Sequence, residues 1–413
     1  MRLSQVPYIF FILFSLFFSV ALHAQRSEIL SPNIATLQVV AGDDWMTMPI
    51  AELNGDTPII ISFDELSHTY HRYSYSVQHC EADWTPSTEL IESDFVDGFA
   101  TGNTIDDNEQ SINTNVLYTH YKLQIPNDHC RLKLSGNYIV IVYDEDNDDT
   151  PVLKACFMVA ENRMSVRMEV SSNTDVDVNK SHQQVSMSLN YNGMRVTNPS
   201  EQIKTVVMQN WRWDNAVVNA KPQYVRSDGL VWDHCRDYIF PAGNEYRKFE
   251  TLDPTHTTMG VERVGWDGAR YQAWIFPDEP RPSYVYDEDA NGAFYVRNSE
   301  NEGNDTESDY IITHFTLKSP RLNGDVYLNG AWTQDRFIPE YKMQWNEMSE
   351  LYEATVPLKQ GYYSYQYLLM TSDGSLNTVP SEGSFYQTEN KYQALIYYRG
   401  QGERTDRLVG YSY

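Results

Sequence analysis

The chain has 413 residues and a formal net charge of −26 at pH 7, from 57 acidic and 31 basic side chains. A surface this acidic repels the phosphates of nucleic acids and of anionic lipids, so we expect neither as a partner. Aromatic residues make up 13% of the chain, and 30 of them are tyrosines. Because tyrosine suits half-buried strands, the composition favours an all-β protein, with roughly two to four domains for this length.

The first residues are predicted to form a secretion signal. Arg2 is their lone basic residue, residues 9–22 are almost entirely apolar, and Ala24 offers a small residue for cleavage. The apolar stretch is short for a bilayer span, so a signal peptide of residues 1–24 is favoured over a retained membrane anchor. No cysteine follows the predicted cut, which argues against a lipid anchor there. We therefore expect a soluble, exported mature chain.

Residues 25–160 are predicted to form the first β-sandwich. Runs 35–41 and 57–63 are apolar and β-branched, and residues 70–80 alternate between two faces. A long polar excursion follows at 81–115, and loops of that length are usually functional or mobile.

A Gly-x-Tyr sequence at Gly136 and Tyr138 opens a late strand of this unit and resembles the tyrosine corner of immunoglobulin-like domains. Val140 stands where an antibody domain has its cysteine, so the antibody disulfide is not expected.

Two further β units are expected. Residues 161–308 form a central β domain that ends in a polar linker at 298–308, and residues 309–400 form a C-terminal sandwich followed by a tail at 401–413. Gly361 and Tyr363 repeat the Gly-x-Tyr sequence of the first unit. Few helices are expected, because no long stretch has helical periodicity. The predicted fold class is all-β, with tandem immunoglobulin-like/E-set β-sandwich domains.

Four cysteines are present, at Cys80, Cys130, Cys156 and Cys235. An oxidising compartment allows disulfides, but the sequence does not choose among the three pairings. Histidine precedes three of these cysteines, yet adjacent residues on a strand point to opposite faces and no Cys-x-x-Cys spacing occurs. Buried thiols or one disulfide are therefore favoured over zinc.

An acidic run after the late strand of the first unit has the alternate-residue spacing of a calcium loop, at Asp144, Asp146 and Asp148. An EF-hand needs glycine at the sixth position and glutamate at the twelfth, where this chain has Asp149 and Ala155. An acidic hairpin tip is the favoured interpretation, and weak calcium binding is the alternative.

Catalytic patterns are weak in this sequence. Glu81 with Asp83, and Asp94 with Asp97, could be the paired carboxylates of a glycosidase, but an acidic chain offers such pairs by chance. The serine hydrolase, zincin, P-loop and Rossmann signatures are absent. No catalytic residue, cofactor or metal site is therefore predicted.

The C-terminal unit resembles the glycogen-binding-type sandwiches attached to starch-active enzymes. Those modules bind sugar with paired exposed aromatic rings, for which Trp332 and Trp345 are the candidates. Burial of both rings in the core is the favoured alternative, because similarity of fold does not carry a site with it.

Residues 209–216 place Trp211, Arg212 and Trp213 directly after a β-branched run. Two tryptophans, an arginine and an Asp-Asn pair are typical of a specific contact surface or of a locked corner that ends a strand. The corner is the favoured interpretation.

Eleven segments in a fixed order carry a resemblance to a known family. They are residues 79–87 (HCEADWTPS), 97–99 (DGF), 113–114 (NT), 118–121 (YTHY), 135–138 (SGNY), 151–153 (PVL), 157–159 (FMV), 197–199 (TNP), 209–216 (QNWRWDNA), 240–247 (FPAGNEYR) and 359–363 (KQGYY). In this order and spacing they resemble the type IX secretion system plug protein family of Bacteroidetes, over about residues 33–400. One departure is Trp211, where the family pattern leads us to expect a non-aromatic residue.

The resemblance implies a non-enzymatic, periplasmic accessory protein. It would bind the large outer-membrane β-barrel of the translocon at its periplasmic face, occlude the pore when no substrate passes, and need no small-molecule substrate. The expected contact residues are Trp84, Asp97, Phe99, Trp211, Arg212 and Trp213. A secreted carbohydrate-binding or adhesin-like β-sandwich protein is the alternative.

Overall fold

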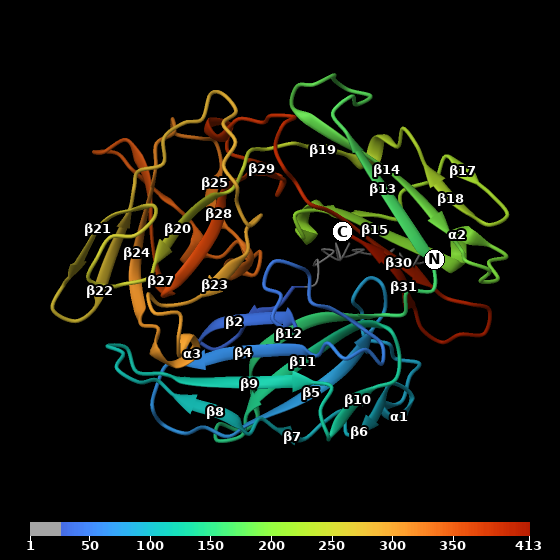
Figure 1. The fold of residues 1–413 in the computed structure, drawn as a ribbon, viewed down its shortest axis with the longest axis horizontal. Helices are drawn as coiled ribbons and strands as arrows, with labels where there is room; N and C mark the ends of the chain where they lie inside the picture. Colours follow the sequence, from blue (N-terminus) through green and yellow to red (C-terminus); the bar gives the residue numbers. More distant parts are fainter. Residues whose placement is uncertain (1–25) are drawn as a thin grey trace, which may run out of the picture.

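The computed structural model describes residues 26–413, which form three β units (Figure 1). The predicted signal peptide lies outside the described residues. Among residues 26–413 the helices are single turns, and none is long and apolar enough to span a membrane. The predictions of a β protein and of a low helical content are confirmed.

The first unit packs two sheets around one core. One sheet has the order β2 (Ile34–Ala41), β4 (Ile59–Glu65), β9 (Thr119–Ile125), β8 (Asp107–Gln110). The other has the order β1 (Glu28–Ile29), β12 (Thr150–Ala160), β11 (Gly136–Asp144), β5 (Tyr73–Cys80), β7 (Asn103–Thr104), with β3 (Ile50–Glu52) beside β12. A ribbon of β6 (Val96–Gly98) and β10 (Cys130–Leu132) follows the short helix α1 (Glu92–Phe95).

The second unit is also built from two sheets. The first contains β13 (Ser165–Ser171), β14 (His182–Asn190), β18 (Gly229–Trp232) and β17 (Tyr224–Val225), with β19 (Ile239–Pro241) also paired to β14. The second has the order β16 (Val217–Val218), β15 (Ile203–Gln209), β30 (Tyr392–Tyr398), β31 (Arg407–Ser412). The helix α2 (Pro199–Gln202) leads into β15.

The third unit places β28 (Gly361–Met370) at the centre of one sheet, where it pairs with β20 (Arg247–Thr251), β23 (Phe294–Val296), β25 (Asp325–Asn329) and β29 (Leu376–Thr378). The facing sheet has the order β21 (Val261–Trp266), β22 (Tyr271–Ile275), β24 (Tyr310–Leu317), β27 (Leu351–Lys359), β26 (Gln344–Asn346). The helix α3 (Asn304–Glu307) precedes β24.

The sheets depart from the predicted boundaries in two places. Strands β20 to β23, which were assigned to the central domain, belong to sheets of the third unit. Strands β30 and β31 return to the second unit, and β31 lies in the predicted tail. Figure 1 shows these two strands in red within the green unit. Pairing across some 190 residues leaves no signal in the local sequence, and the division into domains stays a prediction.

The first and second units stack sheet on sheet. The β12–β11–β5 sheet buries one face in the core of the first unit and the other against the β15–β30–β31 sheet. A sheet covered on both faces needs apolar residues at successive positions, which explains the continuous apolar runs at 138–142 and 155–160. The stack therefore has four sheets and three apolar layers.

The two Gly-x-Tyr sequences form matching corners. The Tyr138 hydroxyl donates a hydrogen bond of 2.8 Å to the carbonyl of Leu134, and the Tyr363 hydroxyl donates one of 2.5 Å to the carbonyl of Lys359. Both bonds reach back four residues and anchor the start of a central strand. A Cβ at Gly361 would lie 2.3 Å from the carbonyl oxygen of Tyr295, so close backbone approach requires glycine there.

The cysteines are buried within the sandwiches. Cys80, Cys130 and Cys235 are free thiols, and Cys156 packs in the same apolar cluster as Cys80. Burial raises the pKa of Cys80 to about 12 and that of Cys130 to about 11, so these two thiols stay protonated. The disulfide alternative is therefore not realised at Cys80, Cys130 or Cys235.

Candidate partner-contact site

The chain turns sharply where β15 ends. Asn210 and Trp211 both have left-handed backbone angles, with φ of 53° and 58°. Asn210 suits this conformation because its amide exchanges hydrogen bonds with the neighbouring chain, accepting from the backbone of Lys391 at 2.8 Å and donating to Asn390 at 2.7 Å. The turn is thus fixed against the segment that leads into β30.

Side-chain contacts close the corner after this turn. The amide of Asn215 accepts from the backbone N–H of Gln209 at 3.2 Å and donates to its carbonyl at 3.1 Å. Arg212 donates two hydrogen bonds to Asp214, at 3.1 and 2.5 Å, and both side chains are mostly buried. Burial opposes the charge on Arg212, but Asp214 outweighs it and raises the pKa of the guanidinium. The geometry is that of a locked corner.

The tryptophans of this corner meet a tryptophan of the first unit. The rings of Trp84 and Trp213 lie edge to face, with centroids 5.6 Å apart and planes at 85°. Trp84 is only 5% exposed, while Trp211 and Trp213 are half-buried against the same apolar cluster. Three of the six predicted contact residues therefore pack together inside the molecule, across the interface of the first and second units.

A cleft of about 160 Å³ opens beside these rings. The three tryptophans and Met48 line it, and Asp335 enters from the third unit, so the cleft marks the junction of all three units. Burial and the neighbouring Asp214 raise the pKa of Asp335 to about 6. Within residues 26–413 the indole N–H groups of Trp84 and Trp211 are shielded from solvent and have no hydrogen-bond partner.

Two of the six predicted contact residues lie away from this corner. Asp97 is in β6 and Phe99 follows that strand, on the β6–β10 ribbon that lies beside α1 (Figure 1). Asp97 is exposed, and Phe99 is 65% exposed with its backbone N–H bonded to the carbonyl of His129 at 2.8 Å. The six predicted residues thus divide into an internal corner, which includes Arg212, and an exposed ribbon.

A second junction was not predicted from the sequence. Lys359 of the third unit and Asp64 of the first unit form an ion pair of 2.6 Å, and each side chain is only 1% exposed. The same carboxylate accepts hydrogen bonds from Tyr310 at 2.7 Å and contacts His120 at 2.7 Å.

Burial favours a neutral form for each member of this pair. Burial raises the pKa of Asp64. Lys359 and His120 lower it by more than burial raises it, so the net pKa of Asp64 lies below its ordinary value. Burial also lowers the pKa of Lys359. We take the pair as ionised, because the carboxylate has three donors around it. The sequence feature closest to this junction was the segment 359–363 of the family resemblance. That segment does not show that Lys359 pairs with Asp64.

The end of the long polar excursion also reaches the third unit. The carboxylate of Asp309 accepts from the backbone N–H groups of Asn115 and Val116 at 2.7 and 3.0 Å. The hydroxyl of Tyr118 donates to the carbonyl of Ser308 at 2.7 Å. The predicted linker at 298–308 is therefore bound to the first unit along its C-terminal end.

The candidates for sugar binding and catalysis are engaged in internal contacts. Trp332 is 7% exposed and donates from its indole to the carbonyl of Ser364, as the core interpretation predicts, and Trp345 is half-buried with its ring edge on Tyr352. Glu81 binds Arg399, and Asp94 binds Arg404 at 2.8 Å. These two ion pairs tie the first unit to the C-terminal segment.

Comparisons with known proteins agree with this architecture. The family model described as the type 9 secretion system plug protein 1st domain matches residues 34–161. The crystal structure of a hypothetical protein from Parabacteroides merdae ATCC 43184 has 41% sequence identity and a TM-score of 0.91, over 94% of this chain and 98% of that one. No curated protein matches the chain.

The matched residues of the family model cover the first unit, in which seven of the eleven resembling segments lie. The relative of known structure extends the likeness over the second and third units. The chain therefore carries the first domain of the type 9 secretion system plug protein family.

Proposed function

We propose that this chain is a non-enzymatic plug that binds the outer-membrane β-barrel of the type IX translocon and occludes its periplasmic opening. The plug family's first domain in this chain is the observation that carries this proposal. The chain would act in the periplasm, at the inner face of the outer membrane, with the barrel as its partner and without a small-molecule substrate.

The joining of the three units supports this role. A stopper for a pore wide enough to pass folded cargo must keep its shape, and flexibly linked domains would not. Here an apolar layer joins the first unit to the second, and the Lys359–Asp64 pair joins the first to the third. Figure 1 shows the second and third units side by side on the first.

The repeated corners support an immunoglobulin-like or E-set identity for the first and third units. In each, a tyrosine bonds back to a carbonyl four residues earlier, and a phenylalanine on the paired strand stacks on its ring. The stacked pairs are Tyr138 with Phe157 at 5.5 Å and 9°, and Tyr363 with Phe249 at 5.3 Å and 11°. This recurrence is typical of sandwiches with a tyrosine corner.

Among the predicted contact residues, Phe99 and Asp97 suit the barrel contact best. Phe99 is an exposed aromatic anchor beside a carboxylate, the kind of residue that dominates reversible interfaces. Trp84 and Arg212 are committed to the internal corner, and Trp211 and Trp213 reach solvent only partly. The corner would act indirectly, by holding the first unit in place.

Co-purification tests the proposal directly. A tagged full-length chain, expressed in its native host, is purified from detergent-solubilised outer membranes, and the partners are identified by mass spectrometry. We expect the translocon barrel to be recovered in stoichiometric amounts. Recovery of no barrel, together with binding of the chain to polysaccharides on a sugar array, would contradict the plug and favour the carbohydrate-binding alternative.

A further inference from the structure

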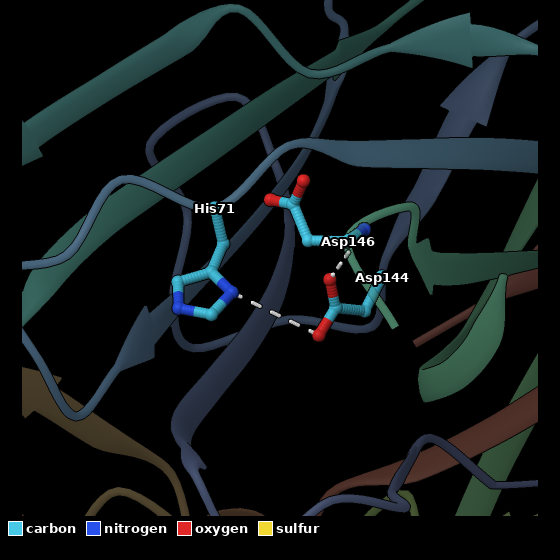
Figure 2. A group of neighbouring side chains, drawn as sticks. All are labelled: His71, Asp144 and Asp146. Carbon is cyan, nitrogen blue, oxygen red and sulfur yellow. Dashed lines mark hydrogen bonds and ion pairs between the residues drawn. The ribbon is translucent and has the colours of Figure 1, made fainter. Parts of the chain in front are cut away.

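One group of metal-ligating side chains lies outside the contacts described so far. His71 lies two residues before β5, and Asp144 and Asp146 lie at the tip of the β11–β12 hairpin (Figure 2). The pairing of β11 with β5 brings them together, since Asp144 lies opposite Tyr73 in the register. One ligand atom from each of the three side chains lies within 4.8 Å of the other two.

Hydrogen bonds hold each of the three residues in place. The hydroxyl of Tyr121 clamps the backbone of His71, accepting from its N–H at 3.1 Å and donating to its carbonyl at 2.9 Å. Asp144 uses Oδ1 to accept from the backbone N–H of Asp146 at 3.1 Å, and Asp146 uses Oδ2 to accept from that of Arg72 at 2.9 Å. Each carboxylate is thus oriented by one oxygen and keeps a second oxygen for a ligand.

The imidazole of His71 faces the carboxylate of Asp144, although the His71 side chain is 30% exposed. Its Nδ1 is shielded from solvent and has no hydrogen-bond partner within residues 26–413. Nδ1 points toward Oδ2 of Asp144, which lies 3.8 Å away. That distance is too long for a hydrogen bond. Two ligands on one zinc ion lie about 3.4 Å apart, so a small closure of the side chains would seat a metal between them.

We propose that His71, Asp144 and Asp146 bind one divalent transition-metal ion of the zinc class. One imidazole nitrogen with two carboxylate oxygens suits such an ion, whereas calcium favours six or more oxygen ligands. Water fills the remaining coordination positions. The ion links the loop before β5 to the β11–β12 hairpin and stabilises this end of the first unit. The proposed ligands differ from the calcium pattern in the sequence, because the third ligand is His71 and not Asp148.

Calorimetric titration of the full-length chain with Zn²⁺ alone tests the site. Asp146→Asn removes a ligand and one negative charge, and Asp148→Asn is the matched control because Asp148 is exposed on the same hairpin tip and lies outside the ligand group. We expect Asp146→Asn to weaken Zn²⁺ binding at least about tenfold, and Asp148→Asn to change it less than about twofold. Saturating Zn²⁺ should raise the melting temperature of the wild type and of the control more than that of Asp146→Asn.

Other histidine–carboxylate pairs on the surface, such as His182 with Asp177 and His256 with Asp253, give background binding that the paired variants share. His71→Gln provides a second test, because it removes the nitrogen ligand without touching the hairpin. Equal Zn²⁺ affinity in the wild type, Asp146→Asn and His71→Gln would overturn the proposal. Equal losses in Asp146→Asn and Asp148→Asn would also overturn it, because they would indicate a general attraction of the acidic hairpin.

Discussion

The first unit meets its two neighbours through interfaces whose buried centres differ in chemistry, although ion pairs such as Glu81 with Arg399 also join it to the second unit. Against the second unit it presents an apolar layer that includes Met158, Ile139 and the edge-to-face pair of Trp84 and Trp213. Against the third unit it presents a buried charge, where Asp64 accepts from Lys359 and Tyr310 and contacts His120.

This difference predicts how the stability of each interface responds to substitutions. An apolar layer loses stability in proportion to the side-chain volume removed and does not depend on pH. A buried ion pair contributes little net stability when intact, but removing one partner leaves a charge that neither water nor protein solvates. The second interface therefore depends on all of its members being present, whereas the first tolerates gradual changes.

Lys359→Met gives the largest expected effect. The substitution keeps the apolar stem but leaves Asp64 buried without its cation, so we expect a loss of about 4 kcal/mol in the free energy of unfolding. Adding Asp64→Asn to Lys359→Met should recover part of the loss, because no unpaired charge remains. Denaturant unfolding at pH 7 measures both variants. Additive losses in the double variant would mean that charge does not control this interface.

Trp84→Ala comes next. The ring is nearly fully buried, but it borders the cleft and the site can relax, so we expect a loss of about 3 kcal/mol that is the same at pH 5 and pH 8. Trp84→Phe should cost less because it fills part of the space. If Trp84→Ala weakened binding of the barrel without lowering thermal stability, the ring would be a partner contact and the internal-corner assignment would fail.

Asp335→Asn tests the cleft where both interfaces meet. Its pKa is raised from the ordinary value of 3.8 to about 6, so the folded state holds the proton more tightly than the unfolded state does. The contribution of Asp335 to the free energy of unfolding is therefore fully present below about pH 4 and is lost as the pH rises through 6. Because the side chain is half-buried, we expect Asp335→Asn to stabilise the chain by only about 1 kcal/mol at pH 8 and to have no effect at pH 4. Melting curves at the two pH values measure this, and an equal gain at both would contradict the assignment.

Phe99→Ser is expected to change stability least, within about 0.5 kcal/mol, because the ring is exposed. If Phe99 anchors the barrel contact, the same variant should weaken binding about tenfold. Val176→Ser is a matched control, since Val176 in the second unit is also 65% exposed. Equal binding by both variants would remove the β6–β10 ribbon from the predicted interface.

Features that depend on local sequence were predictable. The Gly-x-Tyr corners at Tyr138 and Tyr363, the burial of Trp332 and the locked turn after β15 follow from residues a few positions apart. The return of β30 to β15 and the pairing of Lys359 with Asp64 join residues about 190 and 295 positions apart. No periodicity or turn signal records such pairings, so the sheet boundaries and the polar junction required the structure.

Deleting the gene and measuring the permeability of the outer membrane tests the central claim most directly. If the chain occludes the translocon, the deletion strain should admit large antibiotics that the wild type excludes, while type IX secretion largely persists. A wild-type copy should restore the barrier, and a copy carrying Lys359→Met should restore it only in part. Unchanged permeability in the deletion strain would contradict the account.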